Sequence, residues 1–275
     1  MDPNPAASTS VASPTDAPFQ RYVEHVMGMP ISLALRGPHA NGWTGRAAWD
    51  AVITELREVD LIFSTYRVDS VISRLGRGEL ALRDCPAQVA EVLELGERAE
   101  AESDGAFSVR LPVDPAQPGG ARRLDPSGVV KGWAAERASR HLTALTDTDF
   151  CLSAGGDIVG RAATWREPWQ IGIEDPHDAS RVIAVVPLRS GAVATSGTAH
   201  RGAHLVDART GRGTTGIASV TVIGPSLTWA DIDATAAYAH GTGAADWLRT
   251  RPIHSALVVG SDGRTEIVTP PTIPT

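Results

Sequence analysis

A carboxylate and a hydroxyl group lie four residues apart in the last fifth of the sequence, at Asp231 and Thr235. They follow the strand-like run 218–223, and if a helix starts here, both side chains lie on one helix face. Two hard oxygen ligands at a helix start, with space for substrate phosphates, can hold Mg²⁺. An Asp near a helix start can also act simply as a cap that complements the helix dipole. The pair alone leaves both interpretations open.

A glycine-rich turn with one lysine precedes a predicted helix in the middle of the chain. It reads Asp125-Pro-Ser-Gly128-Val-Val-Lys131-Gly132, and the helix is expected to run to about Leu145. The two glycines keep side chains away from the helix start, where backbone N–H groups and Lys131 would bind a phosphate. The spacing is not that of a P-loop, G-x-x-x-x-G-K-S/T. Many strand-to-helix turns also contain glycine for geometry alone.

Other residues could contact a ring or move a proton. Tyr66 offers an aromatic face and a polar tip to a ring-shaped ligand. Gly105, before Ala-Phe, is well placed as the C-cap glycine of the preceding helix. His200, His204 and Asp207 lie near one another in a loop. A surface histidine is functional only where its environment shifts it, so a structural role is favoured for these two without further context.

The composition suits a globular chain of 275 residues, with 42% hydrophobic and 21% charged residues. The net charge of −7 argues against a nucleic-acid binder, which needs a basic surface. The two cysteines, Cys85 and Cys151, indicate buried free thiols. There is no apolar run near the ~20 residues that a membrane segment requires. Residues 1–20 lack the features of a secretory signal and are predicted to be a disordered tail, so a cytoplasmic location is expected.

A single domain is expected over residues 21–268, followed by a loose tail at 269–275. Its predicted helices are 44–63, 86–102, the one after the glycine-rich turn, and a last one that starts near Asp231 and continues through 244–249. The predicted strands are 19–35, bulged at Gly28, and 150–159, 169–176, 182–188, 192–197, 218–223 and 255–268, the last with a hairpin at Asp262-Gly263. Without regular β-α-β alternation, these elements favour an α+β fold with mainly antiparallel sheets and packed helices.

In this order, the motifs resemble one family, the FAD:protein FMN transferases, or ApbE-like flavin transferases. The resemblance extends from about residue 22 to residue 268. It rests on Met27-Gly28; Ser64-Thr-Tyr66-Arg67-Val-Asp69-Ser70; Asp104-Gly105-Ala106-Phe107; Asp125-x-x-Gly128-x-x-Lys131-Gly132-x-Ala134; Gly155-Gly156-Asp157; Ala194-Thr195-Ser196-Gly197 with His204-Leu-Val-Asp207 and Thr210-Gly211; and Ala230-Asp231-x-x-Ala234-Thr235-Ala236.

The resemblance implies an ApbE-like (T-fold-like) architecture in which FAD binds between two subregions. It also implies a Mg²⁺-dependent reaction that splits the pyrophosphate of FAD, transfers FMN to a Thr or Ser hydroxyl of an acceptor protein and releases AMP. Mg²⁺ on the phosphates would neutralise charge and orient the in-line attack. FAD hydrolysis to FMN and AMP, and FAD binding without turnover, are the alternative functions.

The resemblance also implies site residues. His204 and Asp231 are the expected catalytic residues, and Asp157 or Asp207 could share the proton transfer with His204. The expected metal ligands are Gly128, Asp231, Ala234 and Thr235. The residues expected to contact FAD are Met27, Tyr66, Gly105, Ala106, Phe107, Asp125, Lys131 and Leu205.

Three positions depart from the family pattern. Ser108 stands where the family usually has Asp, which removes a carboxylate close to the expected ring site. Ala208 stands where the family prefers Pro, and Asp125 is followed by Pro-Ser in place of Leu-Gly. The Asp231/Thr235 pair and Lys131 are unaffected by these changes.

Overall fold

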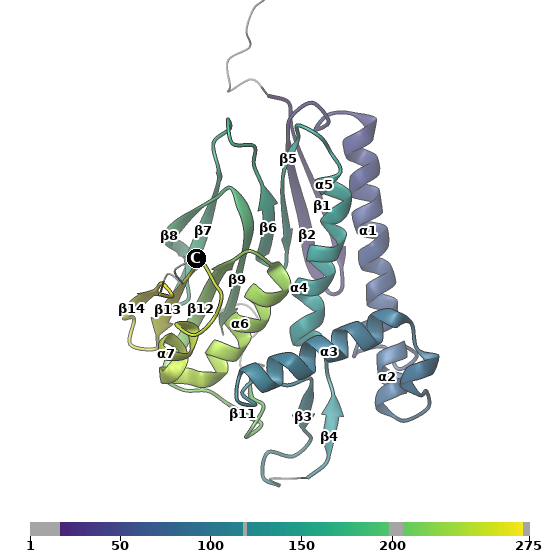
Figure 1. Cartoon of the computed structure of the whole chain (residues 1–275), viewed down its shortest axis with the longest axis vertical. Helices are drawn as coiled ribbons and strands as arrows, with labels where there is room; N and C mark the ends of the chain where they lie inside the picture. The colour runs from purple at the N-terminus through teal and green to yellow at the C-terminus, as the bar shows by residue number, and fades with distance from the viewer. Residues whose placement is uncertain (1–16, 118–119, 198–205, 272–275) are drawn as a thin grey trace, which may run out of the picture.

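The computed structural model describes residues 17–117, 120–197 and 206–271. Its main sheet is antiparallel throughout the described part of the chain, which confirms the predicted α+β class (Figure 1). Over these residues it has eight strands, in the spatial order β1 (Phe19–Val26), β2 (Met29–Arg36), β5 (Asp149–Ala154), β6 (Asp157–Arg161), β9 (Ser190–Gly197), β12 (Ile217–Gly224), β13 (Ser255–Gly260) and β14 (Thr265–Val268). β1 begins two residues inside the predicted tail.

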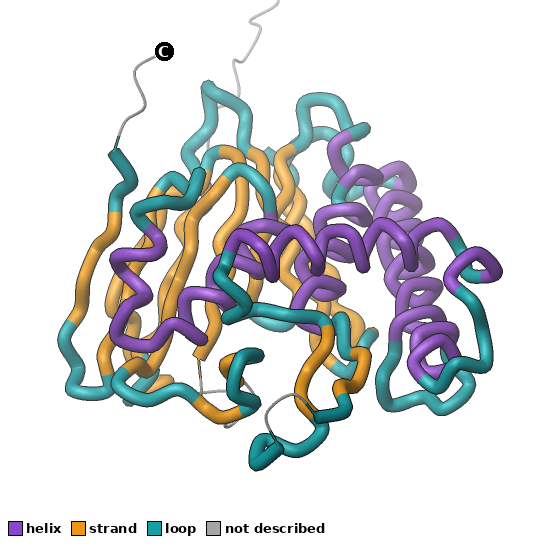
Figure 2. The backbone as a smooth tube through the Cα atoms, turned by 60° about the horizontal axis from the view of Figure 1, so that its bottom comes forward, coloured by secondary structure: helices purple, strands orange, loops and turns teal. Residues whose placement is uncertain are grey.

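Helices lie across one face of this sheet, as Figure 2 shows. They are α1 (Trp43–Phe63), α2 (Val71–Gly76), α3 (Ala87–Glu102), α4 (Ser127–Ala138), α5 (Arg140–Thr143), α6 (Leu227–His240) and α7 (Ala244–Leu248), with short 3-10 turns at Leu82–Asp84 and Gly241–Gly243. α1 has the predicted amphipathic spacing, and it buries Trp49, Val52, Leu56, Val59 and Phe63 in the core. Among the described residues, no helix is both long and apolar enough to cross a bilayer.

A long hairpin covers part of the opposite face of the sheet. It consists of β7 (Trp169–Asp175) and β8 (Asp178–Leu188). Side chains alternate across a strand, so Ala192 and Ala194 of β9 pack with the helices, while Val193 packs with Ile171 and Leu188 of the hairpin. The layers are therefore helices, sheet and hairpin. Two short ribbons, β3 (Arg110–Pro112) with β4 (Arg122–Leu124) and β10 (Val206–Asp207) with β11 (Arg212–Gly213), extend from the loops.

Two predicted interrupted strands are hairpins. The first strand divides into β1 and β2 at Met27 and Gly28, which adopt φ of 57° and 70° while Val26 pairs with Met29. Two central residues with positive φ form the tight hairpin turn that matches the strand twist, so the bulge predicted at Gly28 is wrong. Gly155 and Gly156 likewise turn β5 into β6. The hairpin predicted at Asp262-Gly263 is confirmed between β13 and β14.

Two predicted helix ends also differ from the structure. At the end of α3, Asp104 takes the left-handed conformation with φ of 51°, and the N–H of Gly105 bonds the carbonyl of Glu100 at 2.8 Å. This is a Schellman-type ending whose αL residue is an aspartate, one position before the predicted glycine. The helix expected to reach Leu145 divides at Ser139 into α4 and α5.

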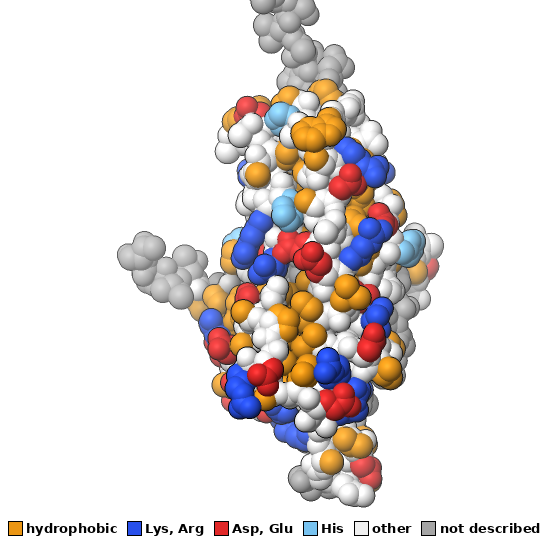
Figure 3. All heavy atoms as spheres, turned by 90° about the vertical axis from the view of Figure 1, so that its right-hand side faces the viewer, with side chains coloured by type: hydrophobic (Ala, Val, Ile, Leu, Met, Phe, Trp, Pro, Cys, Tyr) orange, Lys and Arg blue, Asp and Glu red, His pale blue; other side chains and the backbone are white. Residues whose placement is uncertain are grey.

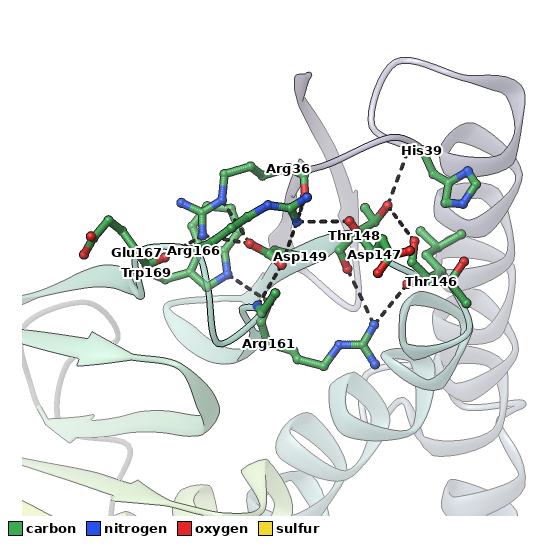
Figure 4. A network of polar contacts seen from close by, with 12 residues as sticks. Arg36, His39, Thr146, Asp147, Thr148, Asp149, Arg161, Arg166, Glu167 and Trp169 are labelled. Atoms are coloured by element: carbon green, nitrogen blue, oxygen red, sulfur yellow. Dashed lines mark hydrogen bonds and ion pairs between the residues drawn. The ribbon is translucent and has the colours of Figure 1, made fainter. Parts of the chain in front are cut away.

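A buried carboxylate ties the start of β5 to the neighbouring loops (Figure 4). Asp149 accepts bonds from Arg36 at 2.8 Å, from Arg166 at 3.0 Å and from the N–H of Ala163 at 2.9 Å. Arg161 reaches the carbonyls of Thr143 and Leu145. Two guanidinium groups thus share the Asp149 carboxylate, and these charge-assisted bonds fix the end of the sheet. On the face drawn in Figure 3, acidic and basic side chains are interspersed.

Candidate active site

Lys131 of α4 lies between two buried carboxylates. Its Nζ is 2.5 Å from Oδ2 of Asp157 on β6 and 3.2 Å from Oδ1 of Asp231 on α6. Both aspartates are 1% exposed, whereas the lysine side chain is 19% exposed. Three elements from distant parts of the sequence thus place two carboxyl groups and one ammonium group at one point.

The close packing of α4 against α6 depends on Gly132. A Cβ at this position would lie 2.7 Å from the carbonyl oxygen of Leu227 and 2.8 Å from Cβ of Asp231, which is too close for any side chain. The Gly132 N–H donates to Oδ2 of Asp231 at 3.0 Å. The glycine that the sequence assigned to a phosphate-binding turn therefore also allows the helices to approach and orients the Asp231 carboxylate.

Asp231 does not cap its helix. Ser226 is the N-cap of α6 and accepts the N–H of Trp229 at 3.4 Å, so Asp231 lies in the second turn and the capping role considered for it is wrong. The predicted relation to Thr235 holds, since both residues lie within α6 and four positions apart. Thr235 Oγ1 is 3.0 Å from Oγ of Ser196 at the end of β9.

Asp157 was not among the predicted binding or metal-ligating residues. Its Oδ1 accepts the N–H of Thr195 at 3.0 Å, and its Oδ2 meets the Lys131 ammonium as an ion pair without hydrogen-bond geometry. The sequence feature that could have identified Asp157 was the glycine pair at 155 and 156. These residues form a turn with positive φ, which places the next residue at the start of a strand. The neighbour across the sheet could not be identified from the sequence.

Burial and charge act against each other at this centre. Burial opposes the charge on Lys131, but Asp231 and Asp157 outweigh it and raise the lysine pKa above its ordinary value. Burial raises the pKa of Asp231 to about 7, with repulsion from Asp157 adding to the shift and Lys131 opposing it. With both carboxylates ionised, the three groups carry a net charge of −1.

The donor atoms fit a hard cation such as Mg²⁺. The Asp231 carboxylate accepts bonds from Lys131 and Gly132, which leaves acceptor positions free among its roughly four lone pairs. One oxygen of Asp157 also lacks a hydrogen-bond donor. Within the described ranges, no group of three or more His, Cys, Asp or Glu side chains forms a metal cluster. A cation here would depend on one or two carboxylates with hydroxyl and carbonyl oxygens, which is the usual arrangement for Mg²⁺.

Phe107 and Gly128, two of the predicted site residues, lie against each other. A Cβ at Gly128 would come within 2.9 Å of Cε2 of the Phe107 ring, so glycine leaves this ring its space at the start of α4. Phe107 and Ala106 are buried. The carbonyl of Ala106 accepts the N–H of Ala208, which joins the turn after α3 to the loop between β10 and β11.

The other predicted residues are spread around this centre. Met27 is half-buried in the β1–β2 turn, and Tyr66 is 98% exposed after α1. Asp125 accepts the Ser127 hydroxyl at 2.6 Å and contacts Arg123 at 3.2 Å at the start of α4. Ala234 is buried in α6 beside Thr235. His204 and Leu205 lie outside the described residues.

A cavity of about 560 Å³ lies beside the Gly105 turn, within the size range of small-molecule sites. Its wall includes Arg122, Arg209 and Arg212, which are suited to anionic groups, and also the acidic residues Glu100 and Asp114. Ser108 donates to Oε2 of Glu100 at 2.6 Å. Ser108 is thereby paired with a carboxylate supplied by α3.

Known proteins resemble this chain in sequence and in fold. A sequence profile of the ApbE family matches residues 27–113 and 108–258. The FAD:protein FMN transferase of Rhodobacter capsulatus is 32% identical over 153 residues, covering 51% of this chain and 29% of that protein. The enzyme of the same name from Treponema pallidum is 33% identical over 162 residues, covering 52% and 45%. Each match thus spans less than half the length of the curated relative.

Solved structures share the fold over most of the chain. The ApbE protein of Thermotoga maritima superposes with a TM-score of 0.77 at 21% identity, covering 91% of this chain and 97% of that one. The flavin transferase ApbE of Vibrio cholerae gives a TM-score of 0.76 at 21% identity, covering 92% and 97%. These similarities establish the fold. Because the family profile extends over most of the sequence, the chain belongs to the ApbE family.

Proposed function

We propose that this protein is a Mg²⁺-dependent transferase that moves FMN from FAD to a Thr or Ser hydroxyl of an acceptor protein and releases AMP. The observation that carries the proposal is the buried contact of Lys131 with Asp231, with Thr235 on the same helix face. The centre combines one ammonium group with hard oxygen ligands, as the handling of a pyrophosphate requires. Two sequence relatives named FAD:protein FMN transferase support the same activity.

Asp231, Thr235 and the carbonyls of Gly128 and Ala234 would hold the cation. When bound, Mg²⁺ would neutralise the phosphate charges and orient the phosphorus for in-line attack. Lys131 would contact the pyrophosphate. Asp231 and Asp157 raise the lysine pKa and keep its ammonium group charged at this position. Gly105, Ala106, Phe107, Tyr66, Met27, Asp125 and Leu205 remain the proposed contacts to FAD.

In the proposed reaction, the acceptor hydroxyl oxygen forms a bond to the phosphorus on the FMN side of the pyrophosphate. The bond from that phosphorus to the bridging oxygen breaks, and AMP leaves with this oxygen. The hydroxyl proton passes to a base, for which His204 is the proposed group because the ordinary histidine pKa lies near neutrality. The FMN phosphate becomes a phosphodiester to the acceptor.

Mass spectrometry of the acceptor tests this function. We expect a protein or peptide with a candidate acceptor Thr to gain the mass of one FMN when incubated with the enzyme, FAD and Mg²⁺, while AMP appears in equal amount. Accumulation of free FMN and AMP with every acceptor unmodified would instead identify an FAD hydrolase. FAD binding without any turnover would identify a binding protein.

The metal assignment is tested with Asp231→Ala. We expect this variant to lose Mg²⁺-dependent turnover, because Asp231 contributes the carboxylate of the proposed ligand set. Turnover at the wild-type rate, still dependent on Mg²⁺, would place the metal elsewhere.

His204→Ala is expected to slow transfer and leave FAD binding largely intact.

A further inference from the structure

Glu136 of α4 joins three groups at the start of α6. Its Oε2 accepts the Ser226 hydroxyl at 2.8 Å, the Thr228 N–H at 2.9 Å and the Thr228 hydroxyl at 2.5 Å. Thr228 is the second residue of α6, so its N–H has no intrahelical acceptor of its own. Glu136 therefore caps α6 from a neighbouring helix, and its negative charge faces the positive end of the α6 dipole.

The capping carboxylate lies one turn beyond Gly132 on the same helix, α4. α4 and α6 are consequently bonded at two separate points. At one point the Gly132 N–H donates to Asp231, and at the other Glu136 holds Thr228. A single point would allow α6 to pivot about it, whereas two points fix both its rotation and its position along α4.

This geometry determines where the proposed ligands lie. Asp231 lies three residues after Thr228, and Thr235 lies seven residues after it. Asp231 and Thr235 are therefore on the same helix face as Thr228, the face that Glu136 fixes against α4 and the sheet. Lys131 belongs to the same helix as Glu136 and already contacts Asp231. The capping bond therefore connects the element that carries the lysine to the element that carries the proposed metal ligands.

We propose that Glu136 is a positioning residue for FMN transfer, acting through α6 to hold Asp231 and Thr235 in place relative to Lys131 and Asp157. The expected effect on the rate of FMN transfer rests on the proposed function. The expected effect on the position of α6 rests on its two contacts with α4. Glu136 acts without touching the substrate.

Kinetics of Glu136→Ala and Glu136→Gln test the role. We expect the alanine variant to lower kcat by about tenfold or more, because displacements on the order of 1 Å can cost up to ~10²-fold, and to require more Mg²⁺ for half-maximal rate. The KM for FAD should stay close to the wild-type value. Glutamine keeps an oxygen that accepts the Thr228 N–H, so this variant should retain most of the wild-type kcat. Both variants lose the negative charge, so a low kcat in both would mean that the charge of Glu136 matters and its hydrogen bond does not.

Glu91→Gln is the matched control. Glu91 borders the same cavity of about 210 Å³ as Glu136, accepts the Trp133 indole N–H at 2.9 Å and lies on α3. Its replacement removes a nearby carboxylate without altering the contact to α6, so kcat and the Mg²⁺ requirement should remain unchanged. Equal losses in the Glu91 and Glu136 variants would overturn a specific positioning role.

Hydrogen exchange provides a readout independent of activity. In Glu136→Ala we expect faster amide exchange in the peptide that covers the first two turns of α6, with unchanged exchange in β1 and β2. Wild-type exchange in α6 would overturn the inference, as would faster exchange with an unaltered kcat. If the wild-type protein transfers no FMN, the proposed function fails. Two measurements then still decide whether Glu136 positions the ligands: hydrogen exchange in α6, and the affinity for Mg²⁺ measured by calorimetry.

Discussion

At the scale of single residues, the site depends on one ammonium group shared by two buried carboxylates. The sequence supplied Lys131 and Asp231 as candidates because each lies in a recognisable local pattern, a glycine-rich turn and a polar pair on a helix. It did not supply their contact, since residues 131, 157 and 231 are distant along the chain. Ser108 illustrates the same limit, because its partner Glu100 lies on the preceding helix and takes part in the wall of a cavity.

Lys131→Met should destabilise the protein and abolish FMN transfer. The substitution leaves Asp157 and Asp231 buried without their shared cation, and breaking such a pair typically costs about 3–5 kcal/mol. Urea unfolding measures the loss in the free energy of unfolding. Arg137→Met, on the same helix, removes a more exposed ion pair to Glu55 and should cost less. Equal losses in the two variants would mean that the buried centre contributes no special stability.

At the scale of elements, the decisive contact is that of α4 with α6. The amphipathic pattern predicted α1 well because that helix has one buried face and one exposed face. α6 is buried on nearly all sides, so its sequence has little periodicity and its start was placed too late. Met27-Gly28 shows a related difficulty. A turn of two residues and a bulge both contain glycine, and only the pairing of β1 with β2 distinguishes them.

Gly132→Ala should separate these two helices. The added methyl group would meet the backbone of Leu227 and the side chain of Asp231, and overpacking of this kind typically costs about 1–3 kcal/mol. We expect a lower melting temperature and slower FMN transfer. Gly243→Ala is the control, because a Cβ there would meet no atom within 4 Å and its φ of −85° suits alanine. A Gly132 variant as stable and active as this control would contradict the close-packing argument.

At the scale of the whole molecule, α6 is also tied to the C-terminal part of the chain on its other side. Asp233 is 1% exposed and accepts Nε of Arg251 at 3.0 Å, and Arg251 also contacts Glu102 of α3 at 2.6 Å. Burial raises the pKa of Asp233 to about 6, and Arg251 opposes that rise. Because the folded pKa exceeds the ordinary value, the stability linked to this group is fully present below about pH 4. It is lost as the pH rises through about 6.

Arg251→Ala should therefore destabilise the protein more at pH 7.5 than at pH 5. Without the guanidinium, the Asp233 pKa rises further. At pH 5 the carboxyl group is then neutral at little cost, whereas at pH 7.5 folding must either keep it protonated against the pH or bury an unpaired charge. The loss at the higher pH should be on the order of 3–5 kcal/mol. Urea unfolding at both pH values measures it. Arg249→Ala, whose partners Asp246 and Glu266 are exposed, should lose about 0–1 kcal/mol at either pH.

The fold class was predictable because it depends on patterns that repeat along the chain, namely short strands, hairpin turns and amphipathic helices. The strand order was not, because β2 pairs with β5 across a gap of more than a hundred residues. Asp149 and Arg36 face each other across that pair, and their contact could not be read from either segment. Local chemistry is visible in the sequence, whereas the pairing of distant segments requires the folded chain.

The pairing of β2 with β5 has a consequence for the order in which the protein acquires its structure. The hairpin of β1 and β2 can form from neighbouring residues. The free edge of β2 is paired only when β5 docks against it, and α1 to α5 lie between these two strands in the sequence. Closing so long a segment is slow and leaves that edge open to other chains in the meantime. Lys131 comes before β5, and Asp157 and Asp231 come after it. The centre is therefore completed only when segments from both sides of β5 have docked, so the contacts of Lys131 report the joining of the first and last halves of the chain.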